Sequence, residues 1–345
     1  MHQLIARTHR IRAASILRIG VIIALVMTGN NATIAKNIAT NDDLQVVIKH
    51  PDFNKLIDPQ QKGELLTSQA VWSEGPVCLR NGNLIFSDVK QNKVMQWSKE
   101  KGISVWLSPS DYQNGHAIDK EGRVIAASHG KRAILRLEHD GRWATLVDRF
   151  NGKQLNSPND VVVASDGNIW FTDPTFGILN PKESYGGTPV QGGEFIYRYD
   201  PLNNKLERIA TPEVKSPNGL AFSPHEDRLY IADSQLAHDF DNPNFAHQII
   251  SYSVKDNQLS QGKVFAIIAP GIPDGIKVDL KGNVWSSSKN GVQVFNSKGD
   301  LLGVIQVPSS ATSNLTFCRD SATNKEWLYI TAANKVYRIP MKTGG

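Results

Sequence analysis

The chain repeats one pattern of polar and apolar positions six times. Each copy opens on an Asn, Asp or Glu, continues through a short strand and a Gly- or Asp-centred turn, and closes with a second strand that ends on a polar residue. The third copy, for example, runs from Asn159-Asp-Val-Val to Gly167-Asn-Ile-Trp-Phe-Thr-Asp173. The residues that open the six copies, called the anchors from here on, are Glu74, Asn114, Asn159, Asn218, Asp274 and Asn314.

The spacing of the anchors predicts a β-propeller. Successive anchors lie 40, 45, 59, 56 and 40 residues apart, and each interval has room for two further strands. Units of about 40 residues with four strands are typical of propeller blades. We therefore expect an all-β, six-bladed propeller that occupies residues 36–345 as a single domain. A solenoid or a β-sandwich is the alternative fold, but a sandwich would not repeat one polar residue at the head of six equivalent strands.

Two departures from regular spacing carry information. The segment after Asn314 has room for only three strands, so an N-terminal segment at residues 64–72 is expected to complete the last blade and to remove the open sheet edges. The two longest intervals contain insertions at residues 174–193 and 235–247. Each insertion begins where a second strand ends, on the face where the anchors begin. We therefore expect both insertions to cover a site on that face.

The first 35 residues differ in composition from the rest of the chain. They hold four arginines and no acidic residue ahead of the apolar run at residues 19–27. That run is shorter than the roughly 20 apolar residues that span a bilayer, and it has the length of a signal-peptide core. We expect residues 1–35 to be a signal peptide, with a retained amphipathic anchor as the alternative, and the mature protein to be periplasmic or secreted without a membrane span.

Charge and composition indicate which classes of partner the protein can bind. The chain is 40% hydrophobic and 21% charged, which is ordinary for a globular protein. The formal net charge of +5 falls to +1 when the four arginines of the first 35 residues are removed. The remaining chain therefore has no electrostatic basis for binding nucleic acid.

Only two cysteines occur, Cys78 and Cys318. Two cysteines exclude a disulfide framework and a cysteine-rich zinc site. Each lies four residues after its anchor, in blades that adjoin where the ring closes. Equivalent positions in equivalent blades should point in the same rotational sense, so we expect the two thiols not to face each other and to remain unbonded.

The anchors also predict a metal site. The first strand of each blade lines the propeller axis, so the anchors should converge at one end of it. They offer two carboxylates and four amides, a set that suits a hard cation, and calcium fits best because it accepts neutral oxygens and waters. The alternative is that Asn-Gly and Asp-Gly only begin turns. That alternative serves equally well for Asn114 and Asn314, and poorly for Glu74.

Four motifs, in order, carry a family resemblance: Ser73-Glu74-Gly75-Pro76, Ser157-Pro158-Asn159-Asp160, Ser216-Pro217-Asn218-Gly219 and Pro273-Asp274-Gly275. From about residue 64 to residue 338 the chain resembles the gluconolactonase family, also called the regucalcin or senescence-marker-protein group, and within it the bacterial lactonase branch. The resemblance implies a six-bladed propeller that holds one divalent cation, usually calcium, and opens sugar lactones. It implies a ligand set of Glu74, Asn159, Asn218 and Asp274.

The resemblance leaves substrate recognition open. Regucalcin-type members carry an arginine for substrate contact at the position that Ser157 occupies here. The relatives also include organophosphate-hydrolysing propellers with much the same metal site. The competing functions are therefore calcium-dependent hydrolysis of other esters or organophosphates, and an exported, non-catalytic propeller that binds a protein or glycan. A closed pocket over the anchors would favour an enzyme, and a flat exposed face would favour a binding protein.

A hydrolytic mechanism suggests roles for single residues. A cation would polarise the lactone carbonyl, a water would attack, and a carboxylate would accept its proton. Asp274 is the candidate base because it is the only Asp among the anchors and follows a proline; a pure ligand role is its alternative. The candidate substrate contacts are Asn114, His116, His129 and Asn314. For the two histidines, a packed and hydrogen-bonded position is the alternative. The sequence contains no Gly-x-Ser-x-Gly, His-Glu-x-x-His or Gly-rich phosphate motif.

Overall fold

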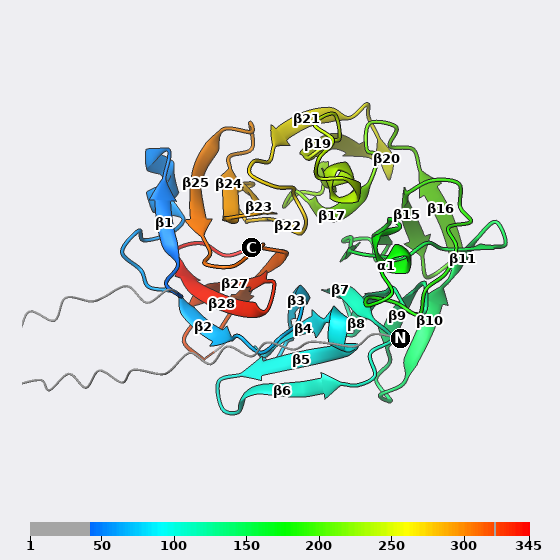
Figure 1. The fold of residues 1–345 in the computed structure, drawn as a ribbon, viewed down its shortest axis with the longest axis horizontal. Helices are drawn as coiled ribbons and strands as arrows, with labels where there is room; N and C mark the ends of the chain where they lie inside the picture. The colour runs from blue at the N-terminus through cyan, green and yellow to red at the C-terminus, as the bar shows by residue number, and fades with distance from the viewer. Residues whose placement is uncertain (1–41, 321) are drawn as a thin grey trace, which may run out of the picture. The chain divides into compact units, whose positions relative to one another are not determined.

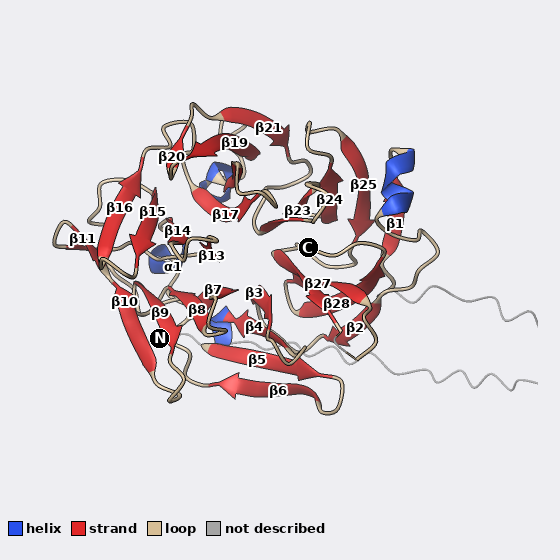
Figure 2. Cartoon of the chain, turned by 180° about the vertical axis from the view of Figure 1, so that it is seen from behind, coloured by secondary structure: helices blue, strands red, loops and turns tan. Residues whose placement is uncertain are grey.

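Antiparallel β-sheets form nearly all of the regular structure, and six of them stand in a ring (Figure 1). The computed structural model describes residues 42–320 and 322–345. The expected signal peptide at residues 1–35 lies outside the described residues. The described residues belong to one compact unit. The same sequence of sheets is seen from behind in Figure 2.

Each blade is an antiparallel sheet that begins with its innermost strand. Blade 1 contains β3 (Ser73–Cys78), β4 (Leu84–Asp88), β5 (Lys93–Ser98) and β6 (Gly102–Leu107). Blade 2 contains β7 (Gln113–Ile118), β8 (Val124–Ser128), β9 (Ala133–Leu137) and β10 (Trp143–Val147). Blade 3 contains β13 (Val161–Val163), β14 (Ile169–Asp173), β15 (Phe195–Asp200) and β16 (Lys205–Ile209). Blade 4 contains β17 (Pro217–Phe222), β18 (Arg228–Asp233), β19 (Gln248–Lys255), β20 (Gln258–Leu259) and β21 (Lys263–Ile267).

Blades 5 and 6 recruit strands from the N-terminal part of the chain. Blade 5 contains β22 (Ile276–Val278), β23 (Val284–Ser288), β24 (Gly291–Phe295), β25 (Leu301–Gln306) and β1 (Gln45–Ile48). Blade 6 contains β26 (Asn314–Arg319), β27 (Glu326–Ala332), β28 (Lys335–Met341) and β2 (Glu64–Thr67). The connections hold a two-stranded ribbon and four short helices: β11 (Arg149–Phe150), β12 (Lys153–Gln154), η1 (Pro51–Lys55), η2 (Val89–Gln91), α1 (Phe176–Leu179) and η3 (Gln235–His238).

The innermost strands form an unbroken cycle of contacts. β3 contacts β7, β7 contacts β13, β13 contacts β17, β17 contacts β22, β22 contacts β26, and β26 returns to β3. Each blade therefore touches its two neighbours along the axis. This cycle confirms the six-bladed propeller that the anchor spacing predicts.

The second strand of a blade is buried on both faces. In β14, which reads Ile-Trp-Phe-Thr-Asp, all five residues are buried. Neighbouring blades cover the two faces of such a strand, so its sequence is a continuous apolar run instead of an alternation. Between blades 2 and 3, for example, Phe171 packs with Ile125 and Ile134 in one core cluster. The apolar side chains thus hold the blades to one another face to face.

The N-terminal part of the chain closes the ring. β2 pairs antiparallel with β28, with Glu64 opposite Arg338, and the Arg338 guanidinium donates to Glu64 Oε2 at 2.6 and 2.8 Å. This pairing confirms the prediction that residues near Glu64 complete the last blade. β1 adds a fifth strand to blade 5 by pairing with β25. The sequence pattern does not predict β1, because Gln45–Ile48 lies outside the six repeated copies.

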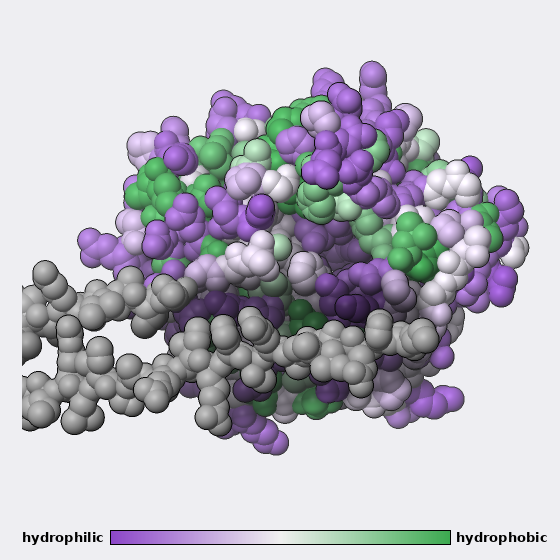
Figure 3. Space-filling model, viewed as in Figure 1, coloured by the Kyte–Doolittle hydropathy of each residue, from purple (hydrophilic) through white to green (hydrophobic). Residues whose placement is uncertain are grey.

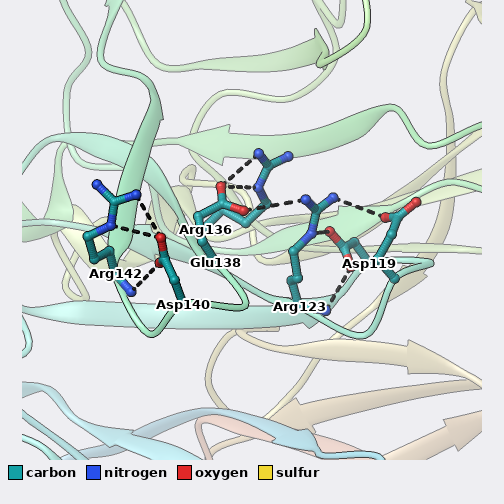
Figure 4. A network of polar contacts seen from close by, with 7 residues as sticks. Asp119, Arg123, Arg136, Glu138, Asp140 and Arg142 are labelled. Carbon is teal, nitrogen blue, oxygen red and sulfur yellow. Dashed lines mark hydrogen bonds and ion pairs between the residues drawn. The ribbon is translucent and has the colours of Figure 1, made fainter.

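The turns that follow the first and third strands carry charged side chains. In blade 2, Arg123 Nε lies 2.7 Å from Asp119 Oδ2, and the Arg136 guanidinium lies 2.7 Å from Glu138 Oε1 (Figure 4). Pairs of this kind each contribute little to stability, but they keep the face remote from the anchors polar. Among residues 42–320 and 322–345, no helix has the length and apolar character that crossing a membrane requires.

The prediction that Cys78 and Cys318 stay unbonded is wrong. The two residues form a disulfide between β3 and β26, with their Cα atoms 5.6 Å apart. The register explains the error. The pairing of β3 with β4 contains an irregularity between Glu74 and Val77, whereas β26 pairs with β27 without a shift. An extra residue in one strand reverses which face later side chains point to, so equal distances from the anchors do not give equal directions.

We expect Cys78→Ser to lower the free energy of unfolding by about 2–4 kcal/mol, because the disulfide restricts the unfolded chain over a sequence separation of 240 residues. Denaturant unfolding with and without a reductant measures this effect. The reductant should destabilise the wild type and leave Cys78→Ser unchanged. Equal intact masses of the wild type before and after reduction would contradict the assignment of the bond.

Candidate active site

Five of the six anchors meet at one cavity. Glu74, Asn114, Asn159, Asn218 and Asp274 all line a cavity of about 1070 Å³. The first four are at most 8% exposed, whereas Asp274 keeps part of its surface open to the cavity. The convergence predicted from the repeated pattern is therefore present for five blades.

A glycine after the anchor lets neighbouring blades approach this closely. A Cβ on Gly115 would lie 2.6 Å from the Asn159 carbonyl oxygen, and one on Gly219 would lie 2.3 Å from the Asp274 carbonyl oxygen. Real side chains do not tolerate such distances. In the same places the glycine N–H groups donate to those oxygens, at 2.8 Å from Gly115 and 2.9 Å from Gly219. These two glycines thus connect the strand that follows Asn114 to Asn159, and the strand of Asn218 to Asp274.

Aspartates at the ends of second strands fix the segments that lead into the anchors. The backbone N–H of Trp72 donates to Asp88 Oδ1 at 3.0 Å, and that of Asn156 donates to Asp173 Oδ2 at 2.8 Å. Ser216 N–H donates in the same way to Asp233 Oδ1 at 3.0 Å. The polar residue that closes each of these three copies therefore holds the approach to the anchor of its own blade.

Asn314 is the anchor that does not reach the cavity. Its Oδ1 accepts a hydrogen bond from the Leu315 N–H at 2.8 Å, and its side chain packs where a Cβ on Gly275 would lie. β26 pairs regularly with β27 from Asn314 onward, whereas β3, β7 and β17 each carry a register shift beside the anchor. The remaining two anchors, Asn159 and Asp274, precede their strands. Blade 6 instead contributes Ser310, Ala311 and Thr312 to the cavity wall.

Two acidic side chains of the cavity floor, Glu74 and Asp274, lie near a third, Asp160, and near Lys277, neither of which lines the cavity. Burial, and then the charge of Asp274, raise the pKa of Glu74 well above its usual value. Burial, and then the charge of Asp160, raise the pKa of Asp274 to about 7. Lys277 Nζ lies 3.8 Å from Asp160 Oδ2. The ionised set of three carboxylates and one ammonium would carry two net negative charges in a desolvated place, where unpaired charge is costly.

This set of donors fits one divalent cation with a preference for oxygen. Asn218 Oδ1 is buried and has no hydrogen-bond partner in the part of the chain that the structure describes, and the Asn218 amide also hydrogen-bonds Asp274. Two positive charges would neutralise the excess at the floor. Among the described residues, no group of three or more His, Cys, Asp and Glu side chains could hold a metal ion. Amide oxygens would therefore have to complete such a site, as hard cations permit.

His116 lies behind the anchors, outside the cavity lining. Its Nδ1 is 2.8 Å from the Gly75 carbonyl oxygen and its Nε2 is 3.2 Å from Gln113 Oε1. Burial lowers its pKa to about 4. Nδ1 can donate to the Gly75 carbonyl oxygen, which links blades 1 and 2, while Nε2 faces the Gln113 side chain of its own strand. Both contacts favour the packed alternative over a substrate contact.

His129 acts on the site through Asn114. Asn114 Nδ2 lies 3.1 Å from His129 Nε2, and burial lowers the pKa of His129 to about 4. An amide nitrogen can only donate, so this contact requires a neutral imidazole whose Nε2 accepts. The bond turns the Asn114 carbonyl oxygen away from His129. His129 is therefore a positioning residue for Asn114, which itself lines the cavity.

The two insertions cover the cavity, as their length predicts. The first contributes Phe176 and Leu179 of α1, with Glu183 further along; the second contributes Leu236 and His238 of η3. The rings of Phe176 and His238 lie 4.7 Å apart, so the insertions touch each other. Figure 1 shows both short helices at the face toward the viewer.

Glu183 and His238 are residues of the cavity that the sequence pattern does not predict. Lys90 Nζ lies 3.4 Å from Glu183 Oε1 and 4.2 Å from the centre of the Trp72 ring, which ties the first insertion to blade 1. His238 Nε2 lies 3.2 Å from Glu194 Oε1, and that hydrogen bond raises the pKa of His238. Glu183 lies in a turn of the first insertion and His238 ends η3 in the second, and no repeated motif marks a position in either insertion.

The chain is a six-bladed propeller with a cavity whose floor consists of carboxylate and amide side chains. Comparison with known sequences identifies the family to which it belongs. Residues 72–334 match the SMP-30/Gluconolactonase/LRE-like region family, and the chain belongs to this family. It is 31% identical over 366 residues to a gluconolactonase from Zymomonas mobilis, a match that covers 99% of this chain and 98% of that protein.

Solved structures agree with this assignment. A gluconolactonase from Xanthomonas campestris is 36% identical, with a TM-score of 0.77 over 86% of this chain and 95% of the other. A regucalcin from Agrobacterium tumefaciens, described as a calcium-binding protein, is 15% identical, with a TM-score of 0.64 over 82% of this chain and 95% of the other. The regucalcin likeness shows the shared fold.

We expect Gly219→Ala to destabilise the protein by about 1–3 kcal/mol, the usual range for overpacking, because the new Cβ would meet the Asp274 carbonyl oxygen at 2.3 Å. The strands β17 and β22 would have to separate at the cavity floor. Thermal unfolding of the variant beside the wild type measures the cost. An unchanged melting temperature would contradict the close approach of these two anchors.

Proposed function

We propose that this chain is a divalent-cation-dependent lactonase that hydrolyses a sugar lactone. The observation that carries the proposal is the meeting of two carboxylates and three amides on the floor of a covered cavity, in a member of the gluconolactonase family. The relative from Zymomonas mobilis, named a gluconolactonase, matches nearly the whole chain. A lactone is an activated ester, so a modest number of polar groups is enough to hydrolyse it.

The cation would be held by Glu74, Asn159, Asn218 and Asp274, and we propose calcium. Two carboxylates and neutral amide oxygens are the ligands that calcium accepts, and the buried Asn218 Oδ1 without a partner supports this choice. A bound divalent cation supplies Lewis-acid polarisation of the lactone carbonyl and charge to stabilise the oxyanion.

The chain's own residues supply orientation and proton transfer. Asp274 is the floor carboxylate with surface open to the cavity, and its N–H donates to Ser287 Oγ at 2.8 Å. It would accept the proton of the attacking water as the oxygen of that water bonds to the carbonyl carbon. The ring C–O bond then breaks, and the proton passes to the departing alkoxide to give the hydroxy acid. Asn114 would orient the substrate.

A covered cavity supports an enzyme over a binding propeller. Hydrolysis of other esters or of organophosphates is the second candidate, because the same floor would serve those substrates.

We also propose export to the periplasm or the medium, on the basis of the leader at residues 1–35. The disulfide between Cys78 and Cys318 supports this location, since such bonds persist in oxidising compartments.

We expect the protein to hydrolyse D-glucono-δ-lactone in the presence of calcium and to lose this activity in EDTA. Adding calcium back in excess should restore it, and p-nitrophenyl acetate and an aryl phosphotriester should be poorer substrates. Proton release in a weakly buffered solution follows the reaction. Hydrolysis of the lactone that is unaffected by EDTA at full chelation would remove the cation from the proposal.

We expect Asp274→Asn to reduce kcat by about 10²-fold or more, in the range that general-base catalysis supplies, even at saturating calcium. The substitution retains an oxygen ligand but removes the base. Asn159→Ala is the matched control, because it removes a proposed ligand that cannot act as a base; calcium should partly rescue it. Near-wild-type kcat for Asp274→Asn at full occupancy, confirmed by calorimetry, would leave Asp274 as a ligand only.

A further inference from the structure

The cavity has a polar floor and an apolar upper wall. The wall contains Phe176 and Leu179 from the first insertion, Leu236 and Phe240 from the second, and Ile272 ahead of Asp274. Leu179 is 58% exposed and Phe240 is 65% exposed, although both face a cavity. In Figure 3 apolar surface lies among polar side chains where Figure 1 places α1.

These residues line a hollow that is much larger than the proposed reaction needs. Pockets of about 300–1,000 Å³ enclose drug-sized ligands, and the volume here is about 1070 Å³. A single six-membered lactone ring on the floor would leave most of the space empty. Above the floor its hydroxyl groups would find Asn180, Glu183 and His238, but most of the side chains that the two insertions contribute are apolar.

We propose that the upper cavity binds an apolar arm of the substrate, so that the enzyme acts on lactones that carry an alkyl or aryl substituent. This inference rests on the proposed lactonase function and extends it. The lactone head would lie on the carboxylate and amide floor, and the arm would extend along Phe176, Leu179 and Phe240 toward the opening. An arm of this kind would cover side chains that otherwise remain in contact with water.

The position of the wall argues for a substrate arm over a protein partner. The wall is continuous with the floor, because Ile272 and Asp274 are two residues apart in one segment that lines the cavity. The contact between Phe176 and His238 also joins the two insertions across the hollow. Residues that docked a protein would instead be expected to project from the surface without enclosing a space.

The wild-type enzyme tests the proposal with lactones of one ring size. We would measure kcat/KM with calcium for γ-butyrolactone, γ-hexalactone and γ-decalactone, and for D-glucono-δ-lactone as reference. We expect kcat/KM to rise by about threefold for each methylene that the wall removes from water. A flat or falling series, with the unsubstituted lactones hydrolysed, would overturn the apolar arm and leave the lactonase intact. No hydrolysis of any lactone would overturn the proposed function itself.

Variants of the wall provide the second test. Leu179→Ser and Phe240→Ser should each lower the ratio of kcat/KM for γ-decalactone over γ-butyrolactone by about fivefold or more, because the arm loses an apolar contact. Leu202→Ser is the matched control: Leu202 is 90% exposed between β15 and β16, away from the cavity, and the ratio should stay at the wild-type value. Wall variants that keep the wild-type ratio, or a control that loses it equally, would overturn the assignment.

Discussion

The close approach of the six innermost strands is the constraint on which the rest of the structure depends. The strands touch in a closed cycle, and at the anchors they come so near that a methyl group would not fit. The N–H of Gly115 reaches the Asn159 carbonyl at 2.8 Å, and that of Gly219 reaches the Asp274 carbonyl at 2.9 Å. One set of contacts therefore both closes the propeller and fixes where the polar side chains stand.

The same approach creates an electrostatic cost that the fold itself does not remove. Glu74, Asp160 and Asp274 lie close enough for their charges to influence one another, and Lys277 offsets only one of them. Face-to-face packing of blades, pairing of β2 with β28 and the disulfide between β3 and β26 hold the ring closed without using the side chains of the floor. The floor can therefore remain short of positive charge without the ring opening, and this shortage is the physical argument for the cation that we propose there.

Much of the fold was predictable from the sequence, because each blade repeats the same local requirements. The anchors, their spacing and the closing strand near Glu64 follow from the pattern alone. Three features do not. The pairing of Cys78 with Cys318 depends on a register shift in β3, which the glycine after Glu74 accompanies and which equal spacing from the anchors leaves out. Asn314 is followed by Leu315 instead of a glycine and lies in a strand that pairs without a shift. β1 joins blade 5 from outside the repeats.

The cavity residues of the two insertions could not be predicted from the sequence, and the reason also concerns substrate specificity. An anchor both packs against the neighbouring blades and lies at the cavity floor, so two requirements limit which residue can occupy its position. Glu183 contacts Lys90 and Asn180, and His238 contacts Glu194 and Phe176. Another loop could make contacts of these kinds with other residues. In our proposals the side chains of the floor carry out the reaction and those of the insertions select the substrate. Leu179 and Phe240 are apolar, exposed and part of the same cavity lining as the floor, and a substrate with an apolar arm would account for them.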